Sequence, residues 1–191
     1  MRWRHSLCGL AGIRFLASTR VVLRHSDMRT THSAARSVPL AQVFPLEAIV
    51  VGVETRTKSG VIFELVRRLV TLGHLAGEEE KSLIARILAR EEVGTTALGN
   101  GIAMPHCRSS SATRYIGALA LEPRGIPFDS IDGQPVHAVF LVFAPPDGRE
   151  HYFEILGNIS AIARDKTRRL HLRGCRTPEM AHHYLQELDS P

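Results

Sequence analysis

The sequence predicts an α/β domain in which a mixed β-sheet lies between layers of helices. Apolar residues with helical spacing alternate in blocks with short β-branched or continuously apolar segments along residues 39–191. Residues 136–143 are apolar at nearly every position, as expected for a central strand that is covered on both faces. A length of 191 residues favours one domain with a real hydrophobic core over two full domains.

The first 38 residues differ in charge from the rest of the chain. They hold seven arginines and one acid, or 7 − 1 = +6, whereas the remainder holds 24 − 7 = 17 basic and 19 − 1 = 18 acidic residues, or −1. The nearly neutral body gives no reason to expect a nucleic-acid-binding face. We interpret residues 1–38 as a basic, disordered extension or as a translation start assigned too far upstream, with Met28 as the true start. A targeting segment is the third interpretation.

The cysteines and the hydropathy indicate the cellular compartment in which the protein is expected. Its three cysteines are widely spaced and form no CxxC pair, which fits reduced thiols in a cytoplasmic protein better than a disulfide framework. No run of 18 or more apolar residues is present, so no membrane span is expected.

The first half of the domain is predicted to hold one strand and two helices. Residues 48–53 are rich in β-branched side chains and form the expected first strand. After a turn in which Ser59 is the candidate cap, the i, i+3, i+4 spacing from Ile62 to Val70 predicts a helix that ends near Gly73. Glutamates 78–80 fall in the first turn of a second helix, where acids interact favourably with the helix dipole, so they need no functional explanation.

The second half is predicted to hold further strands and about three helices. Residues 115–121 and 136–143 are expected to be strands, with a turn at Asp132-Gly133 between them. The first of the following helices has His151 in its first turn, and a short helix covers residues 166–173. Thr177 caps the last helix, with Pro178 at its first position.

The segment from Arg90 to His106 carries the most chemistry. It runs from a helix end through a turn rich in glycine and threonine into a short apolar run, which should place His106 at the end of a strand. A neutral imidazole is a competent nucleophile at physiological pH, and phosphoryl transfer needs positive charge and hydrogen-bond donors around the transferred group. Arg90 could supply a guanidinium, and Thr95 and Thr96 could supply hydroxyls. The pattern therefore suggests a site for phosphate chemistry.

His151 is the second candidate histidine. It follows a Pro-Pro-Asp-Gly turn after the predicted strand 136–143, so one edge of the sheet could bring it close to His106. Each candidate also fits an ordinary role, because histidines are common in surface loops, arginines at helix ends and threonines in turns. A zinc site made of His106, Cys107 and His151 is a weaker alternative, since these residues lack the spacing of a metal motif. We expect no metal and no cofactor.

These motifs together resemble a known protein family. The residues that carry the resemblance are Arg90-Glu91, Gly94-Thr95-Thr96, Gly99-Asn100-Gly101-Ile102-Ala103-Met104-Pro105-His106, residues 128–136 and His151. They are similar to the active-site signature of the fructose/mannitol-type (type 2) enzyme IIA domain of the bacterial phosphoenolpyruvate-dependent phosphotransferase system. The resemblance covers roughly residues 40–190, so the enzyme IIA domain is expected to occupy residues 39–191.

The resemblance implies both a fold and an activity. The fold is a mixed sheet between helix layers, and the activity is that of a phosphohistidine phosphotransferase component. His106 matches the histidine that the phosphocarrier protein HPr phosphorylates, Arg90 the active-site arginine and His151 the second active-site histidine. The group would then pass to a IIB domain, or its presence would regulate a kinase or transporter.

The isolated domain resembles the nitrogen-regulatory members of the family more than a sugar-transport chain. A sugar-transport enzyme IIA and a non-catalytic interaction module with the same fold remain alternatives. Two residues depart from the family pattern. Cys107 stands where a small residue such as glycine is common, and we expect it to be tolerated there. Tyr152 replaces a common aliphatic residue, which could alter docking.

Overall fold

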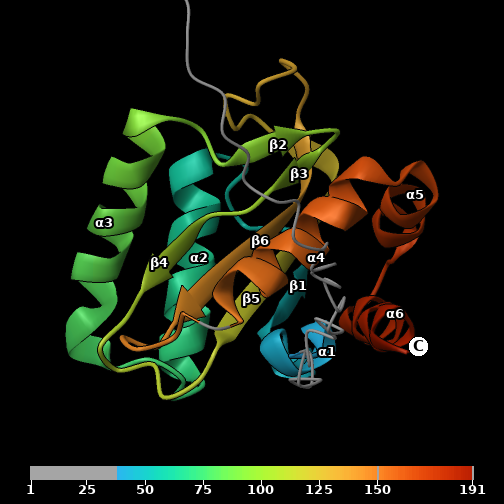
Figure 1. Cartoon of the computed structure of the whole chain (residues 1–191). Coiled ribbons are helices and arrows are strands. Elements are labelled where there is room, and N and C mark those ends of the chain that lie inside the picture. Colours follow the sequence, from blue (N-terminus) through green and yellow to red (C-terminus); the bar gives the residue numbers. More distant parts are fainter. Residues whose placement is uncertain (1–37, 150, 191) are drawn as a thin grey trace, which may run out of the picture. The chain divides into compact units, whose positions relative to one another are not determined.

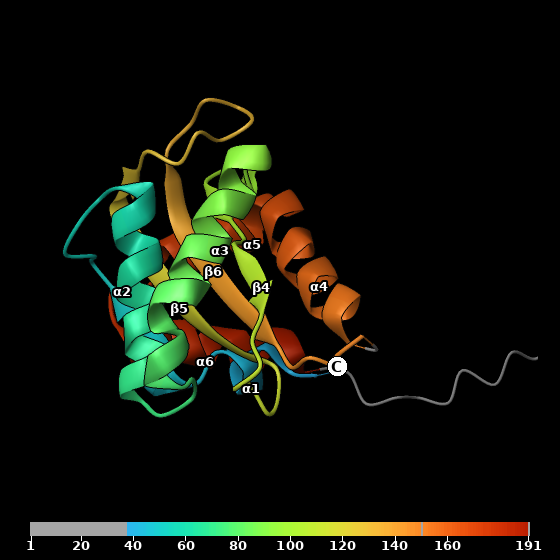
Figure 2. The ribbon, with the colours of Figure 1, turned by 90° about the vertical axis from the view of Figure 1, so that its left-hand side faces the viewer.

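The computed structural model describes residues 38–149 and 151–190. The three interpretations of the N-terminal extension concern residues that, apart from Val38, lie outside this described part. The sheet lies between two layers of helices, as Figures 1 and 2 show. Helices α2 and α3 cover one face, and α1, α4, α5 and α6 lie on the other. The predicted fold class is therefore confirmed.

After helix α1, which was not predicted, the helices and strands follow one another in the predicted order, with more short strands than expected. They are α1 (Leu40–Val43), the 3-10 turn η1 (Leu46–Ala48), β1 (Ile49–Val51), α2 (Lys58–Thr71), the 3-10 turn η2 (Gly77–Glu79), α3 (Glu80–Val93), β2 (Ala97–Gly99), β3 (Ile102–Ala103), β4 (His106–Arg108), β5 (Ile116–Ile126), β6 (Val136–Ala144), α4 (Tyr152–Arg164), α5 (Lys166–Gly174) and α6 (Pro178–Asp189). No helix in the described ranges is both long and apolar enough to cross a bilayer.

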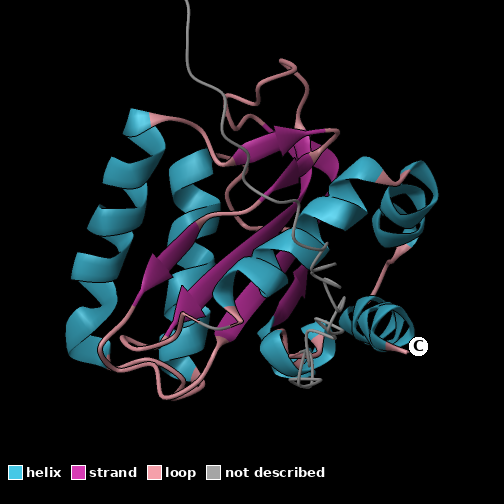
Figure 3. Cartoon of the chain, in the orientation of Figure 1, coloured by secondary structure: helices cyan, strands magenta, loops and turns pink. Residues whose placement is uncertain are grey.

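Strand β6 is the centre of the sheet (Figure 3). It pairs antiparallel with β5 and parallel with β3 and β4. The outer strands are β1, parallel to β5, and β2, antiparallel to β3. The sheet is mixed, and its central strand is the one that the continuous apolar run predicted.

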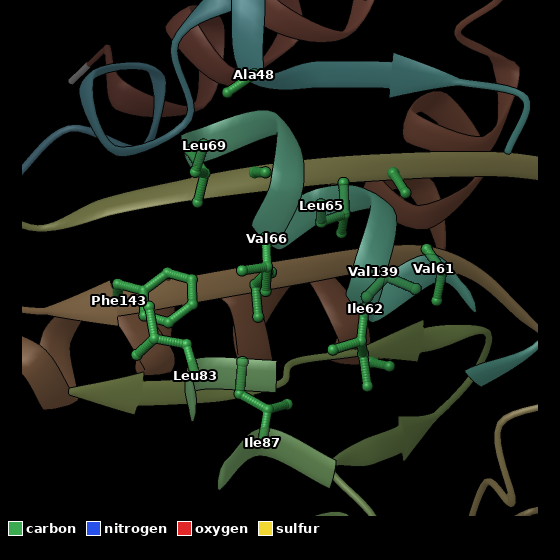
Figure 4. Close-up of a cluster of buried hydrophobic side chains, with 14 of the residues drawn as sticks. Ala48, Val61, Ile62, Leu65, Val66, Leu69, Leu83, Ile87, Val139 and Phe143 are labelled. Carbon is green, nitrogen blue, oxygen red and sulfur yellow. The ribbon is translucent and has the colours of Figure 1, made fainter. Parts of the chain in front are cut away.

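The side chains of β6 alternate between two cores. Val139, Leu141 and Phe143 pack with α2 and α3, as Figure 4 shows for Val139 and Phe143. Phe140 and Val142 pack on the opposite face with α1, α4 and α6. Because helices cover both faces of this strand, every position except the half-buried His137 is buried and apolar.

The helix caps agree only in part with the sequence prediction. Thr57, not Ser59, caps α2, because its hydroxyl oxygen accepts a hydrogen bond of 3.1 Å from the amide of Gly60. Thr177 caps α6 as predicted, with its hydroxyl 3.3 Å from the amide of Met180. The first strand is also shorter than the predicted 48–53, because Ala48 belongs to η1 and the strand ends at Val51, before Gly52 with its φ of 78°.

Glu79 has a role that the sequence did not reveal. It ends η2, one residue before α3, and its carboxylate accepts hydrogen bonds from the hydroxyls of Ser109 at 2.6 Å, Ser111 at 2.8 Å and Ser110. These bonds lower the pKa of Glu79 to about 2. Glu79 therefore ties the start of α3 to the segment that follows β4, which is more than an interaction with the helix dipole.

The Glu79 carboxylate should make folding stability depend on pH in acid. Because its pKa falls from 4.5 in an ordinary environment to about 2 in the folded chain, its contribution is complete above about pH 4.5 and is lost as the pH falls towards 2. Glu79→Gln should lower the urea midpoint at pH 7 and lower it less at pH 3. Glu78→Gln is the control, since none of these three serines binds its side chain. An equal loss at both pH values for Glu79→Gln would contradict the account.

Candidate active site

His106 is the first residue of β4, and not the last residue of a strand as the sequence predicted. It lies opposite Val142 of β6, whose amide donates to the carbonyl of Pro105 at 3.0 Å. The ring nitrogen Nδ1 is 2.8 Å from the carbonyl oxygen of Met104. Because a carbonyl can only accept, Nδ1 carries the proton, and in the neutral ring Nε2 holds the free lone pair. The half-buried imidazole thus offers Nε2 as its nucleophile.

A buried carboxylate holds the segment that precedes His106 in the chain. Glu91, in the last turn of α3, is only 5% exposed and accepts hydrogen bonds from the amide of Thr96 at 3.1 Å and from its hydroxyl. The carbonyl of Thr96 accepts from the amide of Met104 at 3.1 Å, and the carbonyl of Met104 holds His106. A continuous path of hydrogen bonds therefore runs from α3 to the imidazole.

Lys58 balances the charge of this carboxylate. Its Nζ lies 3.9 Å from Glu91 and 2.7 Å from Asp129, and it sits 5.5 Å from the centre of the Phe128 ring. Burying a carboxylate is costly unless a cation or hydrogen-bond donors accompany it. The start of α2, the end of α3 and the segment around residues 128–129 therefore meet at Glu91.

The hydroxyls of Thr95 and Thr96 are both used within the protein. Thr95 Oγ1 donates to the carbonyl of Phe128 at 3.2 Å and accepts from the amide of Ala97 at 3.1 Å. Thr96 Oγ1 donates to Glu91. Both hydroxyls therefore hold the loop in place, and direct contact of either with a phosphoryl group stays a prediction.

The turn between β2 and β3 requires its glycines. Gly99, Asn100 and Gly101 have φ values of 82°, 57° and 79°, in the left-handed region that glycine adopts without strain. The carboxylate of Asp132 accepts from the amide of Asn100 at 2.7 Å. A Cβ at position 101 would also lie 3.0 Å from the ring of His137. Asp132, in the segment of residues 128–136, thus holds the turn between β2 and β3.

Arg90 lies in the last turn of α3 and is exposed. Its Nη1 donates to the carbonyl of Gly94 at 2.7 Å, which is an ordinary role for a cation at a helix end. One guanidinium offers five N–H donors, so this bond leaves further donors on the same group. The positive charge of Arg90 also acts on the phenol of Tyr152.

Tyr152 contacts one candidate residue and directly follows another in the chain. Its half-buried ring packs edge-on against His106, with ring centres 5.9 Å apart. Burial raises the pKa of the Tyr152 phenol, and the charges of Arg108 and Arg90 partly oppose that shift. Tyr152, noted in the sequence only as a departure, thus contacts His106 and is close enough to Arg90 to feel its charge.

His151 immediately precedes α4 as its N-cap residue, one position earlier than predicted. Its Nδ1 is 3.0 Å from the carboxylate of Glu154, and its ring packs edge-on against Tyr115 with centres 6.4 Å apart. Since the carboxylate accepts from Nδ1, Nε2 of the neutral ring is free. His151 directly precedes Tyr152, so the start of α4 connects it to His106.

Cys107 is a half-buried thiol next to His106. Burial raises its pKa, although the charge of Arg86 opposes the shift, and the thiol donates to the carbonyl of Arg108 at 3.3 Å. A protonated thiol is a poor nucleophile and a poor metal ligand. Among the described residues, no three His, Cys, Asp or Glu side chains are grouped as metal ligands.

Glu91 is the one site residue to which the sequence prediction gave no role of its own. Leu83, Ile87 and Glu91 are four residues apart, and all three are buried on one face of α3. An acid that continues an apolar stripe at helical spacing is a signal of a buried, bonded carboxylate. That signal was present in the sequence beside Arg90.

Comparisons with known proteins find relatives of this chain in sequence and in fold. The family model for the phosphoenolpyruvate-dependent sugar phosphotransferase system, EIIA 2, matches residues 42–188. A nitrogen regulatory protein of Bradyrhizobium diazoefficiens is 31% identical over 148 residues, which cover 78% of this chain and 95% of the relative.

Two solved structures share the fold. The nitrogen regulatory protein IIA-Ntr from Neisseria meningitidis superposes with a TM-score of 0.65 and 27% identity, over 76% of this chain and 98% of that one. The complex of enzyme IIAMTL and phosphorylated enzyme IIBMTL from Escherichia coli gives a TM-score of 0.60 and 20% identity, over 74% and 95% of the two chains. The chain belongs to the EIIA 2 family of the phosphoenolpyruvate-dependent sugar phosphotransferase system.

Proposed function

We propose that the protein is a phosphohistidine phosphotransferase component of the nitrogen-regulatory type, with His106 as the phosphorylated residue. The observation that carries this proposal is the 2.8 Å contact between His106 Nδ1 and the carbonyl of Met104, which leaves Nε2 as the nucleophile. The names of the similar proteins from Bradyrhizobium and Neisseria support the regulatory role. We further propose that residues 39–191 form the functional domain and that it acts in the cytoplasm.

The proposed reaction transfers a phosphoryl group from one imidazole to another. Nε2 of His106 attacks the phosphorus of phospho-HPr in line, and the bond from phosphorus to the donor nitrogen breaks as the new bond forms. The proton stays on Nδ1, where the carbonyl of Met104 stabilises the positive charge that the ring gains. The donor histidine, which carries a proton on its other ring nitrogen, leaves as a neutral imidazole, so no further proton donor is required.

Three side chains are proposed to stabilise the transferred group. Arg90 offers the guanidinium donors that Gly94 does not use, and the imidazolium form of His151, paired through Nδ1–H with Glu154, offers an Nε2–H donor. The Tyr152 phenol beside His106 is a neutral donor, because burial raises its pKa. Thr95 and Thr96 contribute indirectly by holding the loop.

A second candidate is transfer to a IIB domain for sugar transport. The Escherichia coli complex pairs an enzyme IIA of the same fold with a phosphorylated IIB, and this supports a IIB domain as an acceptor. In the regulatory case, the phosphorylation state of His106 would instead govern binding to a kinase or transporter. A non-catalytic module with this fold would bind its partner without regard to phosphorylation.

Phosphorylation by the general phosphocarrier system tests the main proposal. With phosphoenolpyruvate, enzyme I and HPr, the protein should gain acid-labile phosphate, and His106→Ala should abolish it. Arg90→Ala should slow labelling by about 100-fold, the effect of removing one preorganised donor from a charged transition state. His183→Ala, on the exposed face of α6, is the control. Labelling of His106→Ala at the parental rate would refute the assignment.

The path of hydrogen bonds from Glu91 to His106 leads to a second prediction. Glu91→Ala should cost about 1–3 kcal/mol in free energy of unfolding, because the buried Thr96 donors lose their acceptor. It should also slow phosphorylation by about tenfold or more in the fraction that stays folded, because the imidazole loses its fixed orientation. Glu91→Gln, which keeps an acceptor oxygen, should recover most of the rate.

The matched control for this variant is Glu92→Ala, which removes the exposed neighbouring acid. Stability is followed by urea titration and rate by the labelling assay. If folded Glu91→Ala accepts phosphate as fast as Glu92→Ala, the path from α3 to His106 has no role in the reaction.

A further inference from the structure

The positive charge of the folded part is concentrated at one place. Residues 164–176 hold six basic side chains and one acid, or 6 − 1 = +5, so the rest of residues 39–191 carries −1 − 5 = −6. The near-neutral total of the domain conceals this concentration. The segment forms the end of α4, all of α5 and the residues that follow α5 (Figure 1).

One face of α5 lines a cavity of about 230 Å³, which we call the α5 cavity. Lys166, Arg169 and Arg173 lie at positions i, i+3 and i+7, so they share one side of the helix. The opposite wall comes from the β2–β3 turn at residues 100–102 and from His137. Leu170 and Leu172 supply apolar surface. Three cationic residues therefore line a space that is large enough for a small molecule.

These cations have no carboxylate to neutralise them. Within residues 38–149 and 151–190, no acidic oxygen lies within 4.0 Å of the charged groups of Lys166, Arg169 or Arg173. Arg169 donates to the carbonyl of Ala163 at 2.6 Å, and the nearby acid Asp165 pairs with Arg168 instead. Like charges on one helix face repel each other, so an anion in the cavity would relieve that repulsion.

We propose that the α5 cavity binds a small phosphate-type anion with at least two negative charges. Guanidinium groups bind two phosphate oxygens at once, and a lysine adds a point charge. The volume is below the range of about 300–1,000 Å³ usual for drug-sized ligands, which favours an ion of the size of pyrophosphate over a large cofactor. The Nδ1–H of His137 donates to the carbonyl of Glu122 at 3.1 Å, so the ring can donate to an anion only in its imidazolium form, through Nε2–H.

The cavity shares a wall with the hairpin that leads to His106. The carbonyl of Gly101 accepts from the amides of His137 at 2.7 Å and Ala138 at 3.0 Å, which joins this turn to β6. Ile102 begins β3, four residues before His106. An anion against this wall would contact the segment that carries the active histidine. Its binding would not require His106 itself, so the inference stands apart from the proposed function.

Titration with pyrophosphate, followed by the ¹⁵N and ¹H amide signals of the unphosphorylated protein, tests the proposal. The amides of Gly101 and Ile102 should shift in a saturable way, both in the parent chain and in His106→Ala. Lys166→Gln with Arg173→Gln should weaken binding by about tenfold or more, because two charge-assisted contacts are lost. Arg164→Gln with Arg168→Gln is the matched control and should change it by less than about threefold, since it removes two nearby charges that do not line the cavity.

Four results would overturn the proposal. One is the absence of saturable shifts at Gly101 and Ile102 with millimolar pyrophosphate. Another is equal weakening by both double variants, which would indicate diffuse attraction to the whole basic segment. Citrate binding as tightly as pyrophosphate would remove the preference for phosphate. A short DNA duplex binding more tightly than pyrophosphate would identify a nucleic-acid surface instead.

Discussion

The buried carboxylate of Glu91 is the interaction on which the functional part of this structure depends. An ion this far from water is stable only with donors and a counter-charge, and here Thr96 and Lys58 supply them. Because Thr96 binds Met104 and Met104 binds His106, the end of α3, the β2–β3 hairpin and the imidazole form one connected unit. The hydrogen bonds that stabilise this unit therefore include the one that sets which nitrogen of His106 is free.

Local sequence patterns predicted the helices, strands and caps that are formed by residues close together in the chain. The central strand β6 was evident because both of its faces are buried, and the cap of α6 was evident because Thr177 and Pro178 are adjacent. The clamp of Glu79 on Ser109 was not evident, because the two residues are 30 positions apart. Long-range contacts of this kind leave no periodicity in the sequence, so only the folded chain reveals them.

The candidate site likewise has residues that the sequence could identify and contacts that only the structure reveals. His106, Arg90 and His151 could be named because strand ends, a glycine-rich turn and a family resemblance point to them, and their roles remain proposals. The internal use of the Thr96 hydroxyl could not be foreseen, because the spacing that marks Glu91 as buried does not show which donors its carboxylate binds. The net charge of the whole domain is near zero, so it did not reveal the basic face of α5. In the folded chain, Lys166, Arg169 and Arg173 line the same cavity.

The central claim is that the carbonyl of Met104 holds the proton of His106 on Nδ1 and so makes Nε2 the nucleophile. The most direct test is to label the protein with ¹⁵N-histidine, phosphorylate it and record the long-range couplings of the modified ring. The account predicts a single phosphohistidine at residue 106, with phosphorus on Nε2 and a proton on Nδ1. Phosphorus on Nδ1, or on another histidine, would contradict it.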